Sequence, residues 1–162
     1  MTEENLKGLR GWLVLVGLGI IISPLRIIAI VFPAYFKIFS NGSWELLTTP
    51  GNDLYHPLWS SILVSEITIN CGLVLIWLYI AFLFFSKKKV FPKWYISTMV
   101  FTLIFIVLDA WAIKAALPNE PVFDADTTKE LVRTLIGVLI WGPYMLVSKR
   151  VKATFIVDRT DT

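Results

Sequence analysis

The chain has 162 residues, of which 56% are hydrophobic and only 17% are charged, and its formal net charge is +3. An ordinary soluble domain has about 25% charged residues, so this composition excludes that class and predicts a small polytopic membrane protein. The positive charges lie in short runs beside apolar segments, which is typical of membrane topology and lipid contact and argues against nucleic-acid binding.

The first predicted membrane helix spans about 12–32 and follows a short basic segment. Its apolar run is longer than that of a signal peptide and shows no clear cleavage site, so we predict an uncleaved helix. Pro24 should kink the helix, because proline removes a backbone donor, and Pro33 should end it. Gly19 is a small residue on one face, where ordinary close packing of a neighbouring helix is expected.

The second predicted helix spans 58–85, after an aromatic and polar segment over 34–57 that should rest at the membrane interface. As an α-helix the segment would be about 42 Å long, which exceeds a hydrocarbon core about 30 Å thick. The helix is followed at once by Lys87, Lys88 and Lys89. By the positive-inside rule, this lysine-rich loop is predicted to be cytoplasmic.

A third helix is predicted over 94–117, and a fourth over 128–147. Between them, residues 118–126 contain acidic residues and no cation, which places this segment opposite the lysine-rich loop. Thr127 and Glu130 have the spacing of a capping box, in which each side chain satisfies a backbone donor at the start of a helix.

Beyond the fourth helix, the tail over 148–162 carries Lys149, Arg150 and Lys152. These basic residues are predicted to lie at the cytoplasmic membrane surface, either as a stop-transfer anchor or as a docking site for a protein partner. Four spans with basic residues near both termini predict one all-α domain over 1–162: an integral membrane four-helix bundle with both termini cytoplasmic.

Each predicted helix contributes a polar or charged side chain at a similar height. Four of these residues lie about 14 or 15 positions from the cytoplasmic end of their helix, which is roughly 21 to 22 Å at an α-helical rise. A fifth, on the second helix, is roughly 28 Å from that end and within side-chain reach of the others. The five residues are Arg26, Glu66, Asn70, Asp109 and Arg133.

Unpaired charge at this depth is costly, so the sequence predicts that Arg26 and Arg133 pair with Glu66 and Asp109 inside the bundle. Two interpretations of this charge layer stay open. The layer could be structural, with ion pairs that specify helix order and register. It could instead line a water-accessible pocket that binds a small ligand or passes protons.

Nothing in the sequence favours enzymatic chemistry. Cys71 is the only cysteine and His56 the only histidine, so an intrachain disulfide and a histidine metal cluster are both impossible. No phosphate-binding glycine loop or nucleophile elbow is present in the sequence. We therefore expect no catalytic residues, no metal and no cofactor.

Short motifs distributed over almost the whole chain resemble the bacterial inner-membrane family called domain of unknown function 2569. Two residues depart from the pattern of this family: Arg10 stands where glycine is expected, and Gly142 stands where an aliphatic residue is expected. The motifs are Gly8-Leu9-Arg10-Gly11-Trp12-Leu13, Ser23-Pro24, Phe84-Phe85-Ser86-Lys87-Lys88, Trp141-Gly142-Pro143-Tyr144 and Ser148-Lys149-Arg150-Val151-Lys152-Ala153-Thr154-Phe155. The resemblance implies a four-helix integral protein of the bacterial inner membrane, with no established activity.

The leading functional hypothesis is a non-enzymatic structural or accessory bundle. One alternative is a small transporter or ion-coupled carrier, which would need an oligomer because one four-helix bundle has little room for alternating access. Another is a protein that binds a lipid or small hydrophobe between its helices. The expected partners are membrane lipids and either a second copy of the chain or another membrane protein.

Overall fold

The computed structural model describes residues 8–156, and its regular elements within that range are all helical. Four helices are long and apolar enough to cross a membrane, which confirms the predicted all-α architecture: α1 (Trp12–Ser40), α3 (Trp59–Phe85), α4 (Phe91–Ala116) and α5 (Ala125–Val147). The remaining helices are α2 (Ser43–Thr48), α6 (Lys149–Val151) and a π-helical turn at Lys152–Ile156. The last part of the predicted tail, 157–162, lies outside the described residues.

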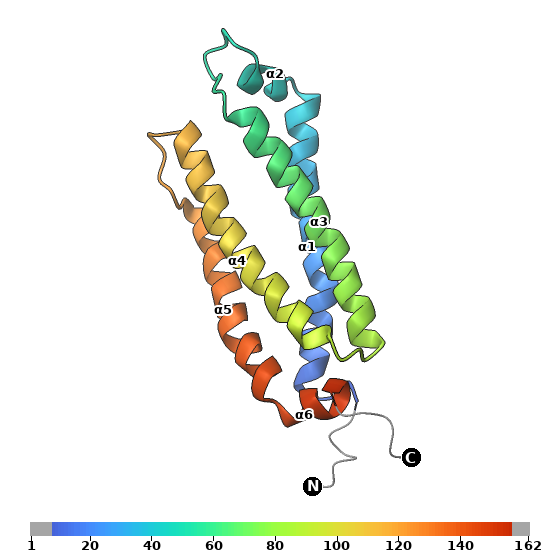
Figure 1. Ribbon diagram of the computed structural model, residues 1–162. Coiled ribbons are helices and arrows are strands. Elements are labelled where there is room, and N and C mark those ends of the chain that lie inside the picture. The colour runs from blue at the N-terminus through green and yellow to red at the C-terminus, as the bar shows by residue number, and fades with distance from the viewer. Residues whose placement is uncertain (1–7, 157–162) are drawn as a thin grey trace.

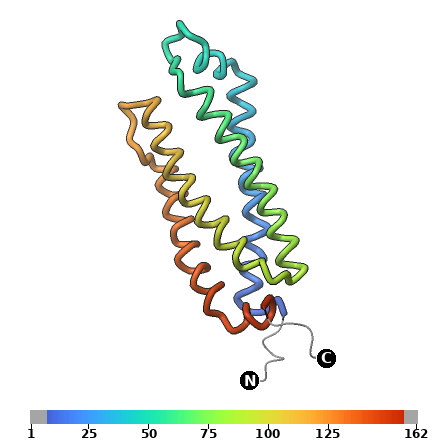
Figure 2. The backbone as a smooth tube through the Cα atoms, in the orientation of Figure 1, coloured from blue at the N-terminus to red at the C-terminus, as the bar shows by residue number. Residues whose placement is uncertain are grey.

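The long helices form two antiparallel hairpins, one of α1 with α3 and one of α4 with α5 (Figure 1). Contacts between α3 and α4 join the hairpins. The hairpins are closest at the end that holds α6 and diverge toward the end that holds α2 (Figure 2). We call these the basal end and the distal end. At the basal end the N–H of Gly8 donates to Oγ1 of Thr154 at 3.2 Å, so the first and last described segments touch.

Helix α1 continues beyond its predicted end. Both Pro24 and Pro33 lie inside the helix, so the prediction that Pro33 ends it is wrong. A proline removes one backbone donor, and in a long apolar helix the flanking turns and neighbouring helices can maintain the structure around it. The extension brings Tyr35 onto α1, and most of the predicted interfacial segment 34–57 therefore belongs to the end of α1 and to α2.

Helix α5 begins earlier than predicted, with Asp124 as its N-cap. The Asp124 carboxylate accepts a hydrogen bond from the backbone N–H of Thr127 at 2.7 Å. The predicted capping box of Thr127 and Glu130 is therefore wrong. Because the N-cap lies three residues upstream of Thr127, the Glu130 side chain is free to pair elsewhere.

The hydrophobic core lies at the basal end and closes on the C-terminal segment. Phe155 and Val151 are 2% and 0% exposed, respectively. The Phe155 ring packs against Phe91 with centroids 4.6 Å apart and against Phe84 at 5.8 Å. The C-terminal segment is thus buried against the bundle through this phenylalanine.

Close packing of α1 on α3 depends on Gly17. A Cβ at this position would lie 2.9 Å from the Phe84 ring, whereas a Cβ at Gly19 would meet nothing within 4 Å. The expectation of close packing at Gly19 is therefore wrong. The small residue that permits the approach of the helices is two positions away, where the aromatic core begins.

Candidate functional site

A cavity of about 780 Å³ lies between the two hairpins and is lined by all four long helices. Along α1 its wall runs from Gly19 to Tyr35, a length of roughly 24 Å at the α-helical rise. The five residues predicted to form the charge layer all line this cavity: Arg26, Glu66, Asn70, Asp109 and Arg133.

The basal half of the cavity is mainly apolar and aromatic. Its walls there include Leu73, Trp77, Tyr95, Met99 and Trp141. The rings of Trp77 and Tyr95 meet edge to face, with centroids 5.9 Å apart and an interplanar angle of 82°. The charged side chains follow toward the distal end, so the cavity is amphiphilic along its length.

Two arginines in the distal half share one carboxylate. Arg26 donates from both terminal nitrogens to Glu130, with Nη1 3.1 Å from Oε1 and Nη2 bonded to Oε2. Arg133 donates from Nη1 to Oε2 of the same carboxylate at 2.8 Å. The predicted pairing of the arginines with Glu66 and Asp109 is therefore wrong, because Glu130 lies closer to both. We refer to these three residues as the arginine triad.

A second polar group joins α1, α3 and α4. The carboxyl groups of Glu66 and Asp109 lie near one another, on α3 and α4, and both line the cavity. The Tyr35 hydroxyl donates to Oε2 of Glu66 at 3.4 Å and accepts from Nδ2 of Asn70 at 3.1 Å. The amide of Asn70 also donates to the backbone carbonyl of Glu66 at 2.9 Å. We call the Glu66 and Asp109 side chains the carboxyl pair.

Both polar groups cross from one hairpin to the other. The triad links Arg26 of α1 to Glu130 of α5, and the carboxyl pair links Glu66 of α3 to Asp109 of α4. The apolar core joins the hairpins at the basal end through Phe84, on α3, and other buried residues. The distal half is therefore held together by polar contacts around a cavity, and the basal half by packed rings.

Two residues of this site, Tyr35 and Glu130, were not predicted from the sequence. The sequence places Tyr35 in the interfacial segment 34–57, because Pro33 is expected to end the helix. It places Glu130 in a capping box. The signal that could have identified Glu130 is its position three residues before Arg133 on one helical face, where opposite charges meet.

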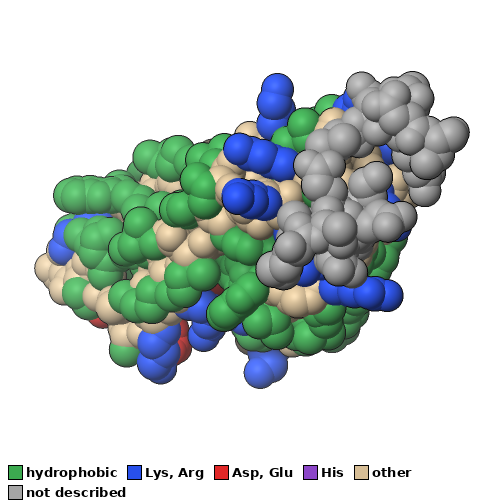
Figure 3. Space-filling view, turned by 90° about the horizontal axis from the view of Figure 1, so that it is seen from below, with side chains coloured by type: hydrophobic (Ala, Val, Ile, Leu, Met, Phe, Trp, Pro, Cys, Tyr) green, Lys and Arg blue, Asp and Glu red, His purple; other side chains and the backbone are tan. Residues whose placement is uncertain are grey.

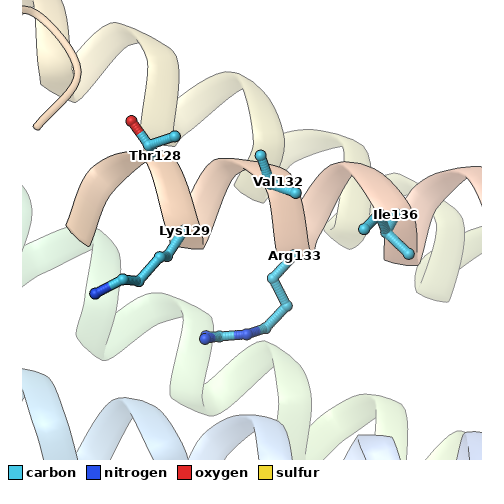
Figure 4. Close-up of a pocket in the computed structure, with 5 residues that line it drawn as sticks. All are labelled: Thr128, Lys129, Val132, Arg133 and Ile136. Atoms are coloured by element: carbon cyan, nitrogen blue, oxygen red, sulfur yellow. The ribbon is translucent and has the colours of Figure 1, made fainter. Parts of the chain in front are cut away.

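A separate open groove of about 470 Å³ runs along α5. Val132 and Ile136 supply apolar surface, while Lys129 and Arg133 extend to one side of the helix, away from Thr128 and Val132 (Figure 4). Lys129 pairs with Asp126 at 3.0 Å on the same helix, with both side chains exposed. The groove lacks a converging set of polar groups, so we do not regard it as the functional site.

The predicted membrane-surface basic residues lie at the basal end, where Figure 3 shows Lys and Arg side chains around the end of the bundle. Arg150 differs from the others because its Nη1 is buried without a hydrogen-bond partner among the described residues. Its Nε would lie 3.8 Å from a Cβ at Gly11. The exposed members of the predicted set are Lys87, Lys88, Lys89, Lys149 and Lys152.

Metal-binding side chains do not gather in the described part of the chain. Between residues 8 and 156, no group of three or more His, Cys, Asp and Glu residues is placed to hold a metal ion. Cys71 is an exposed free thiol on α3. The groups available for ligand contact in the cavity are therefore carboxyl, guanidinium, hydroxyl and amide groups with an apolar wall.

Comparisons with known proteins support the resemblance inferred from the motifs. A family model described as "Protein of unknown function (DUF2569)" matches residues 6–156. Inner membrane protein YdgK of Escherichia coli (strain K12) is 38% identical over 81 residues, which are 50% of this chain and 49% of that protein. The match thus spans about half the length of this curated relative. No solved structure matches the chain.

Proposed function

The chain belongs to the family described as Protein of unknown function (DUF2569), and we propose that it is a non-enzymatic inner-membrane protein that binds a small amphiphilic molecule between its two hairpins. The observation that carries this proposal is the amphiphilic cavity of about 780 Å³. Ligand pockets typically have volumes of about 300–1,000 Å³, with mostly apolar walls and a few converging polar groups. The cavity has both properties.

The gradient of polarity along the cavity supports a defined orientation of the bound molecule. Trp77 and Met99 offer apolar contacts in the basal half, whereas the carboxyl pair and the arginine triad offer ionic and hydrogen-bonding contacts in the distal half. The apolar part of a ligand would therefore point to the basal end. Its polar head would point to the distal end.

The proposed location in the inner membrane rests on the name of the relative, and the proposed orientation rests on the distribution of charged residues. YdgK is named an inner membrane protein. The basal end carries the basic runs, whereas the segment between α4 and α5 carries acidic residues and no cation. By the positive-inside rule the basal end, and with it both termini, would face the cytoplasm. Membrane lipids and a second copy of the chain or another membrane protein are the expected neighbours.

Cysteine labelling can test this orientation. In a Cys71→Ser background, Ser86→Cys places a thiol at the basal end and Asn119→Cys places one at the distal end. In intact bacterial cells with a permeable outer membrane, a membrane-impermeant maleimide should label Asn119→Cys and spare Ser86→Cys until the cells are lysed. The reverse pattern would overturn the orientation.

A cavity-filling variant can test ligand binding. Thr134 lines the cavity, whereas its neighbour Leu135 is exposed and does not. Thr134→Phe should therefore fill the site, and Leu135→Phe is the matched control. The probes are hexylammonium, 1-hexanol and hexyl sulfate, which share one chain and differ in head charge. Calorimetry on the full chain in lipid nanodiscs should detect saturable binding of at least one probe, lost in Thr134→Phe and kept in Leu135→Phe.

A structural or accessory role is the second candidate, favoured by the polar contacts that cross between the hairpins. Under that role the Arg26 to Glu130 pair would serve to hold α1 against α5. If none of the three probes binds in a saturable way, or if binding is the same in Thr134→Phe, ligand binding is overturned. The structural role then stands as the better account.

A further inference from the structure

Building on the proposed function, we propose that the ligand is a cationic amphiphile: an organic ammonium ion whose head lies against Glu66 and Asp109 and whose elongated apolar body extends toward Trp77. The inference rests on three properties of the cavity, which are the balance of charge on its walls, the closeness of its two unpaired carboxyl groups, and its shape.

The charge balance favours a cation. The walls include two arginines, at positions 26 and 133, and four acidic residues, at positions 66, 109, 126 and 130. Both arginines are engaged by Glu130, and Asp126 pairs with Lys129. Within residues 8–156, the carboxyl pair has no Lys or Arg partner within ion-pair distance, so it is the acidic group left for a ligand. A positively charged head complements this arrangement, whereas an anionic head would be repelled by it.

The carboxyl pair defines what the cation replaces. Two neighbouring carboxylates repel one another when both are ionised, so the pair holds one proton when no cation lies between its members. An ammonium head has three N–H donors and can donate to both carboxylates once that proton has left. The exchange balances, because one positive charge enters and one proton is released to the solvent.

The other polar groups near the carboxyl pair are already engaged in contacts with one another or with Glu66. From α1, the Tyr35 hydroxyl contacts Glu66, and Arg26 lines the same cavity. From α5, Glu130 and Arg133 complete the triad. From α3, Asn70 contacts both Tyr35 and the backbone of Glu66, which leaves its amide engaged. The carboxyl pair is therefore the group whose charge can change on binding without breaking an ion pair.

The shape of the cavity favours an elongated molecule. The wall of the cavity runs for roughly 24 Å along α1, so an elongated apolar body can lie along it. Trp77, Tyr95 and Met99 lie at the basal end of the cavity, where an apolar body would contact them.

The three probes with one chain and different heads provide the test. Hexylammonium should bind the full chain at least about tenfold more tightly than 1-hexanol or hexyl sulfate. Glu66→Gln combined with Asp109→Asn should remove that preference, whereas Glu120→Gln, an exposed carboxylate outside the cavity, should keep it. Titration in two buffers of different ionisation enthalpy should show proton release on hexylammonium binding, and none in the double variant.

The experiment distinguishes an error in the proposed cationic ligand from an error in the proposed binding function. Equal binding of the three probes, or tighter binding of hexyl sulfate, with loss in Thr134→Phe would keep a binding cavity and overturn the cationic ligand. Cation binding without proton release would also overturn the exchange at the carboxyl pair. Should the double variant not fold, Asp109→Asn alone, which retains a side chain of the same size, must still lower the preference for hexylammonium.

Discussion

Arg26 and Glu130 form a bidentate ion pair between α1 and α5, so one guanidinium on the first hairpin is bound to one carboxylate on the second. The hairpins diverge toward the distal end (Figure 1), and neither residue of this pair belongs to the buried hydrophobic cluster. Arg133 adds a third hydrogen bond to the same carboxylate. Glu130 is thus the acceptor on which both arginines depend.

Glu130→Gln should destabilise the protein more than loss of an exposed ion pair does. The side chains of Arg26 and Glu130 are 35% and 37% exposed, so we expect a loss of about 1–3 kcal/mol in the free energy of unfolding, below that of a fully buried pair. Asp126→Asn, which breaks an exposed pair with Lys129, should cost less than about 1 kcal/mol. Thermal unfolding in a mild detergent measures both, and equal effects would contradict the bridging role.

Gly17→Ala should destabilise the basal core. The added Cβ would lie 2.9 Å from Phe84, which is 1% exposed and packed against Phe91 and Phe155, so the ring has little room to move. Overpacking of this kind typically costs about 1–3 kcal/mol. Gly19→Ala is the control, because no atom lies within 4 Å of its Cβ and alanine favours the helix. A stable Gly17→Ala variant in the same unfolding assay would show that α1 and α3 pack less closely here.

Phe155→Ala should leave a void beneath the bundle. The ring is 2% exposed and contacts Phe84 and Phe91, so its removal should cost about 3–5 kcal/mol. Lys152→Ala alters an exposed side chain of the same π-helical turn and should change stability by less than about 0.5 kcal/mol. Denaturant unfolding followed by tryptophan fluorescence compares the two variants. A similar, small effect of both would mean that the C-terminal segment does not seal the core.

The protection of backbone amides in the first turn of α5 against hydrogen exchange should depend on pH, because Asp124 titrates. The hydrogen bond from the backbone N–H of Thr127 lowers the pKa of the Asp124 carboxyl below its ordinary value of 3.8. Because the pKa is lower in the folded state, the stabilisation is present above pH 3.8 and is lost as the pH falls through the lowered value.

Hydrogen exchange of the first turn of α5, corrected for intrinsic rates, measures this effect. Asp124→Asn keeps a capping side chain without a titratable group, so its protection should not change with pH, whereas Asp124→Ala should be less protected at every pH. Identical pH profiles for the native chain and Asp124→Asn would contradict the assignment of the titration to Asp124.

The four spans were predictable because hydropathy is a local property that accumulates over about 20 residues. A charge or two within such a stretch, as in α4 with Asp109, does not hide it. Height along the helix was predictable for a similar reason, since each residue adds about 1.5 Å. Counting residues from the helix ends was therefore enough to select Arg26 and four other residues that line one cavity.

The ion pairs could not be predicted in the same way. Each residue turns its side chain by about 100° around the helix axis, so the choice of partner depends on how the helices are rotated against each other. The N-cap of α5 lies three residues upstream of Thr127, so Glu130 does not serve in the predicted cap. The helix continues through Pro33, which brings Tyr35 to Glu66.

The sequence therefore establishes the membrane class of this protein, its four membrane-length helices and the position of each polar residue along its helix, because these depend on neighbours along the chain. The pairing of Arg26 with Glu130, the contact of Glu66 with Asp109 and the cavity between them depend on packing between distant segments. Small shifts in helix ends and rotation change such contacts without changing hydropathy, which is why they emerge only when the four helices are assembled.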